Sequence, residues 1–251
     1  MEVRAVVYSA DLKGDFLLFA CEDTLADFNW PNDTVKELIL TQDFTGKFGE
    51  TASAIYLEEG APRKVLVSGL GKTIELSLEK VRIAFGKALK EAEKLKIRAL
   101  TVAPWTISTL SASDVARAVT ETCLLANYRF DRYLAEKKEV SLTSLQVCYE
   151  EQNEAEVIHA IKVGKTLGQT TNLARTLVNE PGNVMTPERL AQEAVAAGKE
   201  YGFEVEVFEP DAIQEMGMTA FLEVGKASSN SPRLIVMRHQ GAPDQPEQVL
   251  G

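Results

Sequence analysis

The side chains that most often bind metals or act as catalytic bases are scarce in this sequence. Its two histidines are His159, within a predicted helix, and His239, after a predicted strand. Enzyme metal sites usually group several ligands at set spacings such as H-E-x-x-H, and neither histidine belongs to such a motif. We therefore interpret both as surface or packing residues. No serine or cysteine has the nearby histidine base that nucleophilic catalysis would need.

The three cysteines, Cys21, Cys123 and Cys148, give no sign of a reactive site either. They are odd in number, lie far apart in the sequence and lack the CxxC spacing of zinc sites and redox pairs. A free cysteine without such partners usually behaves as a small apolar side chain in the core. We predict three buried thiols.

A short glycine-rich segment, Ser68–Lys72 with the sequence SGLGK, follows a predicted strand and superficially resembles a phosphate-binding loop. The G-x-x-x-x-G-K-[ST] motif is several residues longer and starts a helix at its lysine, whereas no helix is predicted to begin at Lys72. The spacing therefore favours a tight turn.

Acidic residues dominate the charge of the chain, with 37 Asp and Glu against 27 Lys and Arg and a formal net charge of −10. This charge opposes binding to a phosphate backbone, so nucleic acid is not an expected partner. Acidic pairs lie in predicted turns, where carboxylates are usually solvated, and we assign none of them general acid or base work. These pairs are Glu58 with Glu59, Glu150 with Glu151, and Glu209 with Asp211.

Length and composition indicate a packed protein of two domains. A domain takes about 100–200 residues, and the chain has 251, of which 45% are hydrophobic and 25% charged. The first residues show no basic leader followed by a long apolar run, and no later segment approaches about 18 uncharged apolar residues. We expect a cytoplasmic protein with no membrane partner.

Short β-branched runs alternate with amphipathic stretches in the first part of the chain, which is typical of an α/β layered fold. Residues 77–96 carry one apolar stripe at three- and four-residue steps, which predicts a helix packed on a sheet. A further helix is predicted to begin at Ser113 or Asp114, whose side chains can cap the first amides. The predicted strands are Ala5–Ser9, Phe16–Ala20, Ala54–Leu57, Lys64–Gly69, Ala99–Pro104 and Ser144–Tyr149.

The acidic segment 150–156 has no apolar anchor before Val157, so we place the first domain at residues 1–150. A linking helix is predicted at residues 151–178, ended by Pro181 and Gly182. A second α/β unit is expected over residues 179–251. Its predicted elements are a helix at residues 187–201 capped at Thr186-Pro187, strands at Phe203–Glu209 and Leu234–Arg238, a helix at Asp211–Met216, and the opening of another strand at Gln248–Gly251.

Four segments of the chain carry a family resemblance. NLARTLVNEPGNVMTPERLAQEA at Asn172–Ala194 and GMTAFLEVGKASSNSPRLIVMRHQG at Gly217–Gly241 resemble the entry into the catalytic domain of M17 leucyl aminopeptidases. KVLVSGLGK at Lys64–Lys72 and CLLANYRFDRY at Cys123–Tyr133 resemble the N-terminal domain of that family, whose α/β fold is similar to that of macro domains. The resemblance covers the whole chain.

The resemblance implies a macro-domain-like N-terminal α/β domain, a linking helix and the truncated start of an α/β metallopeptidase domain. It implies a cytoplasmic exopeptidase that removes N-terminal residues from peptides, with leucine preferred. Such an enzyme uses two divalent metals, Mn or Zn, and is usually a homo-hexamer. A metal pair can hold the substrate amine, polarise the scissile carbonyl and deprotonate the attacking water.

The metal ligands of the family have no counterpart in residues 1–251. The first of them lie in a V-G-K-G-x-x-F-D-x-G-G-like motif, expected a few residues after Gln248–Gly251. Lys226 echoes this motif without the F-D-x-G-G that should follow, and Asn179 and Glu180 are interpreted as loop residues that tie down the end of the linking helix. We therefore assign no catalytic, cofactor-binding or metal-binding residue. We expect this part of the enzyme alone to be inactive and to bind no metal.

Two other functions stay open from the sequence. A free-standing macro-like ligand-binding or regulatory module, without peptidase activity, would need an anion-binding glycine loop, and Ser68–Lys72 offers one. DNA binding, a side role in some bacterial members of the family, would need a local basic patch in this acidic chain.

Overall fold

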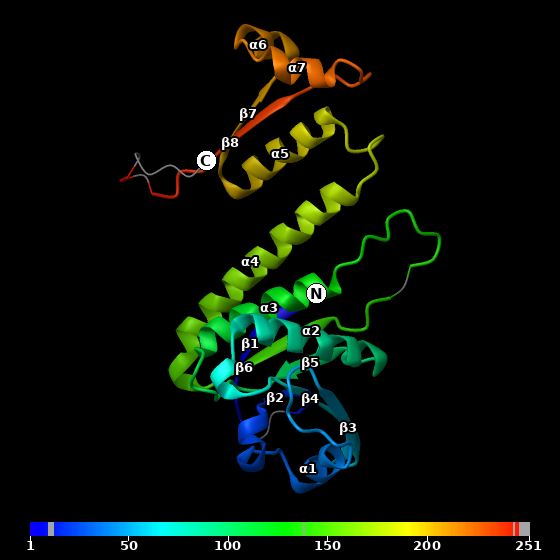
Figure 1. Cartoon of the computed structure of the whole chain (residues 1–251), viewed down its shortest axis with the longest axis vertical. Helices are drawn as coiled ribbons and strands as arrows, with labels where there is room; N and C mark the ends of the chain where they lie inside the picture. Colours follow the sequence, from blue (N-terminus) through cyan, green and yellow to red (C-terminus); the bar gives the residue numbers. More distant parts are fainter. Residues whose placement is uncertain (10–12, 138, 243, 246–251) are drawn as a thin grey trace. The chain divides into compact units, whose positions relative to one another are not determined.

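A computed structural model describes residues 1–9, 13–137, 139–242 and 244–245 of the chain (Figure 1). The chain divides into two compact units, and each is described by itself. Unit 1 is Met1–Leu173 and unit 2 is Ala174–Gly251. Within the described residues, no helix is both long enough and apolar enough to cross a membrane.

Unit 1 is built around a six-stranded sheet with the strand order β1-β6-β5-β2-β4-β3. Neighbouring strands are parallel except for β3, which runs antiparallel to β4 in a hairpin. The predicted α/β class is confirmed, and all six predicted strands are present, with ends that differ from the predicted ones for most of them. They are β1 (Glu2–Val7), β2 (Asp15–Ala20), β3 (Thr51–Glu58), β4 (Ala61–Gly69), β5 (Ala99–Val102) and β6 (Ser144–Tyr149).

Helices pack on both faces of this sheet. α2, α3 and the first part of α4 share one core cluster with the sheet, whereas α1 packs on the other face of β2, β4 and β3 (Figure 1). The helices are α1 (Asp33–Leu40), α2 (Leu78–Lys94), α3 (Ala112–Asn127) and α4 (Glu154–Asn179), with short 3₁₀ turns η1 (Glu22–Asp27), η2 (Thr73–Glu75) and η3 (Glu151–Asn153). The sequence did not predict α1.

The largest core of unit 1 lies between the sheet and α2. The stripe predicted for residues 77–96 is confirmed, because Val81, Phe85 and Ala88 are fully buried and share the cluster of Leu17 and Leu66. Burial of one large apolar side chain stabilises a fold by about 1.5–3 kcal/mol. This face therefore supplies much of the stability of unit 1.

The start of α3 differs from the prediction. Ser111 caps the helix instead of Ser113 or Asp114, and its Oγ accepts a hydrogen bond from the amide of Asp114 at 3.0 Å. Ser111 has the extended backbone that a cap requires, whereas Ser113 and Asp114 already lie in the first helical turn. Several short polar residues in succession made the position of the cap ambiguous in the sequence.

α4 packs closely against α3 through two glycines. A Cβ atom on Gly164 would lie 2.7 Å from the carbonyl oxygen of Arg117, and one on Gly168 would lie 2.8 Å from Cβ of Leu124. Asn172 Nδ2 also donates to the carbonyl oxygen of Leu124 at 2.9 Å. The first part of α4 is thus fixed to unit 1 by backbone contact that only glycine permits.

Unit 2 contains short helices and the two-stranded antiparallel sheet β7-β8. α5 begins as predicted, since Thr186 Oγ1 accepts a hydrogen bond from the amide of Arg189 at 3.3 Å and Pro187 occupies the first turn. The elements are α5 (Pro187–Tyr201), β7 (Glu204–Phe208), α6 (Pro210–Glu215), α7 (Thr219–Gly225) and β8 (Leu234–Arg238). α7 was not predicted, and the strand predicted at Gln248–Gly251 lies outside the described residues.

Candidate functional site

The carboxyl ends of the parallel strands in unit 1 carry the loops where a site is expected. After β2 the chain continues to β3 and β4 on one side, while β5 lies on the other side of β2. Open α/β sheets usually bind ligands where the strand order changes direction in this way. The loops that follow β2, β4 and β5 are therefore the candidate binding loops.

The glycine turn after β4 uses its amides to hold neighbouring loops. The amide of Gly69 donates to the carbonyl oxygen of Glu50, that of Leu70 to Ala20 and that of Gly71 to Gly46, each at 2.9 Å. An anion site would need such amides to be free to point at the ligand. Ser68 and Gly69 belong to the end of β4, and the hydrogen bonds of this segment run to neighbouring loops, so the tight turn stays a prediction.

Gly69 is required because the backbone of a neighbouring loop lies against it. A Cβ atom on Gly69 would lie 2.2 Å from the carbonyl oxygen of Lys47. Gly71 has φ +77°, a left-handed conformation that glycine adopts without strain. The glycines thus serve the packing of two loops against each other.

Glu50 fixes the loop on the other side of this contact. Its carboxylate accepts hydrogen bonds from the amides of Thr45 at 2.9 Å and Lys47 at 3.2 Å, and from the hydroxyl of Thr45 at 3.0 Å. Although desolvation raises the pKa of Glu50, these hydrogen bonds and the charge of Lys47 bring it below the ordinary value. The sequence did not single out Glu50, since its partners are set by the loop conformation.

A second carboxylate lies beside the glycine turn. Asp23 accepts hydrogen bonds from the hydroxyl of Thr73 at 2.6 Å and from the amide of Thr73 at 3.1 Å. The hydroxyl bond is the main cause that holds the pKa of Asp23 below its usual value. A carboxylate kept ionised here opposes the binding of a phosphate group.

An aromatic side chain from the loop after β5 packs against β2. Trp105 packs edge-on against Phe19 of β2, with ring centroids 5.8 Å apart. Its indole Nε1 donates to the carbonyl oxygens of Ile107 at 2.7 Å and Leu110 at 3.1 Å. The indole therefore has its hydrogen-bond partners within the loop, and its role is packing.

The histidines are on the surface and the cysteines are buried, in agreement with the predictions from the sequence. His159 on α4 and His239 after β8 are both exposed. Cys21, Cys123 and Cys148 are free and buried, and desolvation raises their thiol pKa values to about 11, 12 and 12. Because the thiolate is the reactive form, these cysteines are unreactive near neutral pH.

Three carboxylates of the acidic pairs, together with Lys226, form ion pairs on the chain. Glu58 contacts Arg63 at 3.1 Å, Glu209 contacts Arg233 at 3.1 Å, and Glu59 pairs with Lys13. Lys226 pairs with Glu223 at 3.0 Å and is largely exposed. Glu150, Glu151 and Asp211 are exposed as well. Ion pairs of this kind contribute about 0–1 kcal/mol and do not indicate a catalytic site.

The segment after α4 is a compact turn. Glu180 is buried, and its amide donates to the carbonyl oxygen of Thr176 at 3.1 Å. The amides of Val184 and Met185 both donate to the carbonyl oxygen of Pro181, at 2.8 and 2.9 Å. Asn179 is the last residue of α4 and not a loop residue, whereas Glu180 follows the helix. That their side chains tie down the helix end stays a prediction.

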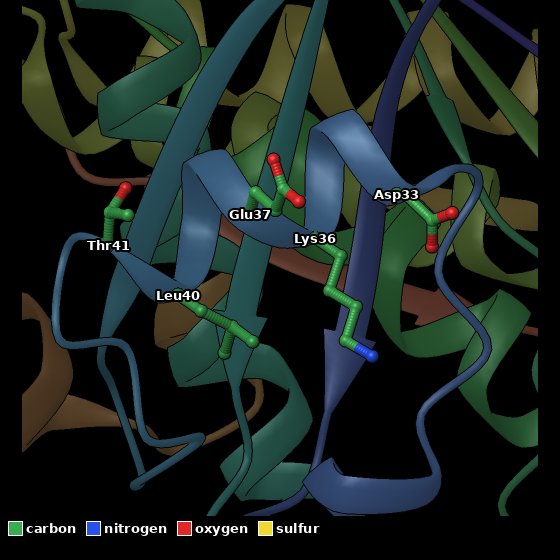
Figure 2. Close-up of a pocket in the computed structure, with 5 residues that line it drawn as sticks. All are labelled: Asp33, Lys36, Glu37, Leu40 and Thr41. Atoms are coloured by element: carbon green, nitrogen blue, oxygen red, sulfur yellow. The ribbon is translucent and has the colours of Figure 1, made fainter.

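Two surface hollows lie among the described residues. One, of about 480 Å³, follows the outer face of α1, and Figure 2 shows that its five lining side chains come from that helix and its C-cap. All five are exposed, so this hollow has no opposing wall. The other, of about 460 Å³ in unit 2, is mainly apolar and lies between the start of α5, α7 and β8; it is lined by Met185, Thr186, Pro187, Leu190, Phe221, Val224, Gly225, Pro232, Arg233 and Ile235.

Two models of one protein family match the chain. The N-terminal domain of the cytosol aminopeptidase family matches residues 27–137, and the catalytic domain of the same family matches residues 172–250. The chain belongs to the cytosol aminopeptidase family. The order of the two matches agrees with an α/β N-terminal domain followed by part of the catalytic domain.

Individual relatives agree with this family. The probable cytosol aminopeptidase of Clostridium perfringens is 38% identical over 229 residues, which are 88% of this chain and 46% of the relative. The one from Persephonella marina is 36% identical over 218 residues, which are 86% of this chain and 44% of the relative. The chain thus spans a little under half the length of these family members.

Solved structures show the same fold. A variant of tomato leucine aminopeptidase matches with a TM-score of 0.76 and 24% identity over 94% of this chain and 50% of that one. The bottromycin maturation enzyme BotP, solved in complex with Mn, matches with a TM-score of 0.72 and 23% identity over 91% of this chain and 45% of that one. At this identity the likeness supports the fold alone.

Proposed function

We propose that the chain is the N-terminal part of a cytosol aminopeptidase that, as a whole protein, removes N-terminal amino acids from peptides, with leucine preferred. The main support is 38% identity over 229 residues to the Clostridium perfringens relative, which extends across 88% of the chain. The match of residues 172–250 to the family's catalytic domain favours a peptidase over a module that only binds a ligand.

The whole enzyme is proposed to use two divalent metals, Mn or Zn. Across the described residues, no group of three or more His, Cys, Asp and Glu side chains could hold a metal ion. The described donors do not fit a metal pair. We therefore propose that the ligands and the catalytic arginine belong to the part of the family sequence that these residues do not match, and that residues 1–251 alone are inactive.

The two units have different proposed roles. Residues 1–150 are proposed as a macro-domain-like N-terminal domain, residues 151–178 as the link and residues 179–251 as the beginning of the catalytic domain. The continuous helix α4 supports such a link, since it runs from Glu154 to Asn179 without interruption. A cytoplasmic homo-hexamer acting on peptides, as the family resemblance implies, is part of the same proposal.

A free-standing binding module has less support. The glycine turn that it would need donates the amides of Gly69, Leu70 and Gly71 to backbone carbonyls, and Asp23 is held ionised nearby. Trp105 packs edge-on against Phe19 of β2. Neither feature favours a nucleotide or a nucleic acid as the ligand of unit 1.

A chimera tests the proposed function. Residues 1–251 would be joined to the unmatched C-terminal part of the Clostridium perfringens relative, and leucyl-p-nitroanilide hydrolysis would be measured with added Mn²⁺ or Zn²⁺ and with a chelator. We expect metal-dependent turnover by the chimera and none by residues 1–251. A folded, metal-loaded chimera without turnover would contradict the proposed activity. Turnover and stoichiometric metal in residues 1–251 alone would contradict the assignment of catalysis to the remaining part.

A further inference from the structure

β3 forms one edge of the sheet in unit 1, where its partner among the described strands is β4. In an antiparallel pair, alternate residues direct their amide and carbonyl groups toward the partner and away from it. The carbonyl oxygen of Ser53 accepts a hydrogen bond from Gln42 Nε2 at 3.0 Å, so Ser53 faces away from β4. Ile55 and Leu57 share this alternation and present their backbone groups at the free edge.

The side chains at this edge are apolar and exposed. Ile55 is 57% exposed and Leu57 is 73% exposed, whereas Ala52 and Ala54, which alternate with them, are buried in the cluster under α1. Natural edge strands usually carry charges, proline or bulges that prevent pairing. The opposite edge, β1, carries Glu2 and Arg4, whereas β3 has no lysine, arginine or proline and a single carboxylate at its end.

The charges near this edge do not repel a second copy, although the net charge of the chain is −10. Glu58 is paired with Arg63 at 3.1 Å, and Glu59 is paired with Lys13. Each carboxylate at the end of β3 therefore has a cation on its own chain. The edge is locally neutral and can approach an identical edge without a like-charge contact.

We propose that β3 pairs with β3 of a second copy of the chain, antiparallel about Tyr56, to form a continuous sheet across two molecules. This register places Ile55 of each copy opposite Leu57 of the other, so that four exposed apolar side chains become one buried cluster. It places Glu58 opposite Ala54. The pairing does not use the carbonyl oxygen of Ser53, which already accepts a hydrogen bond from Gln42. The interface lies in unit 1 and is independent of the proposed peptidase activity.

Sedimentation equilibrium over a range of concentrations tests the interface. The wild-type chain is expected to dimerise, and Leu57→Lys is expected to weaken the dimer at least about tenfold, because two ammonium groups would enter the same apolar cluster. Ile74→Lys is the matched control, since Ile74 is 88% exposed in η2, away from this edge. A wild-type chain that stays monomeric would overturn the proposal, as would a dimer that Leu57→Lys weakens no more than Ile74→Lys.

Disulfide trapping tests the register separately. In this pairing Tyr56 lies opposite Tyr56 of the second copy at a non-hydrogen-bonded position, where Cβ atoms are about 4.5–5.5 Å apart, close to the spacing of a disulfide. Tyr56→Cys is expected to form a covalent dimer under mild oxidation, and Ile74→Cys is not. The three native cysteines are buried and do not compete. A folded Tyr56→Cys variant that cross-links no faster than Ile74→Cys would overturn the register.

Discussion

The two units differ mainly in how much apolar surface they bury. Unit 1 contains two clusters of buried side chains, one on each face of its sheet. In unit 2, Ala191 and Ile213 are the only buried hydrophobic residues among those described, while Val224 is 88% exposed and Met237 is 60% exposed. The same chain thus combines a complete core with a region that has almost none.

This difference has a direct physical consequence for stability. A two-stranded sheet is marginal in water unless further strands or helices cover its apolar face. β7 and β8 form such a sheet, and the hollow beside them leaves the side chains of Leu190 and Val224 exposed. Unit 1 should therefore unfold cooperatively with a large free energy of unfolding. Unit 2 should open locally, with a much smaller free energy of opening.

The largest expected effect comes from Phe85, a fully buried residue of α2 whose ring lies near that of Phe19. Phe85→Ala should destabilise unit 1 by about 3–5 kcal/mol, because it removes a large core side chain and leaves a cavity. Urea unfolding followed by tryptophan fluorescence reports on unit 1, since both tryptophans, Trp30 and Trp105, lie there. Phe221→Ala, in the hollow of unit 2, is the control and should leave this transition unchanged; an equal shift would contradict the independence of the units.

An intermediate effect is expected where α4 meets α3. Gly164→Ala should destabilise unit 1 by about 1–3 kcal/mol, because the new Cβ would lie 2.7 Å from the carbonyl oxygen of Arg117. Gly86→Ala on α2 is the matched control, since its Cβ would meet only Thr122 at 3.9 Å. That control should stabilise the helix by about 0.5–1 kcal/mol. Equal effects of the two substitutions in urea unfolding would show that α4 is not part of the packed unit.

The smallest effect concerns pH and Glu50. Its folded-state pKa lies below the unfolded value of 4.5, so its stabilising effect is present above pH 4.5 and is lost as pH falls through the folded pKa. Glu50→Gln should cost about 1 kcal/mol at pH 7, and the difference from wild type should shrink below pH 4.5. Glu37→Gln, on the exposed face of α1, is the control. If the difference in stability between wild type and Glu50→Gln grew as the pH falls, this role of Glu50 would be contradicted.

The sequence predicted the elements whose signal is local. The stripe on α2 spans almost five turns, and five of the residues that the three- and four-residue steps selected are buried, namely Val81, Phe85, Ala88, Leu89 and Ala92. Leu78 and Leu95 at its ends are only partly buried, and the buried Ala84 was not selected. α1 was missed because it has eight residues and buries only Val35 and Ile39, too few to establish a period. The cap of α3 was misplaced because Ser111, Ser113 and Asp114 all have suitable side chains.

The candidate site was less predictable than the fold. Rejection of Ser68–Lys72 as a phosphate loop followed from spacing alone, but the reason lies in long-range hydrogen bonds from Gly69, Leu70 and Gly71. Glu50 and Asp23 could not be selected, since a carboxylate acquires a lowered pKa from donors that only the folded loops bring near. Family resemblance supplied the proposed activity, which no arrangement of side chains in the described residues would have indicated.

Hydrogen exchange across the chain tests most directly the claim that unit 1 is a complete domain and unit 2 is not. Amides of β4, at Ala61–Gly69, should exchange only with global unfolding, and those of β8, at Leu234–Arg238, should exchange at least about tenfold faster. When exchange is measured under conditions where its rate reports the opening equilibrium, it gives a free energy of opening for each strand, and these two values can be compared. Equal protection of β4 and β8 would contradict the account, because it would show that unit 2 is as stable as unit 1.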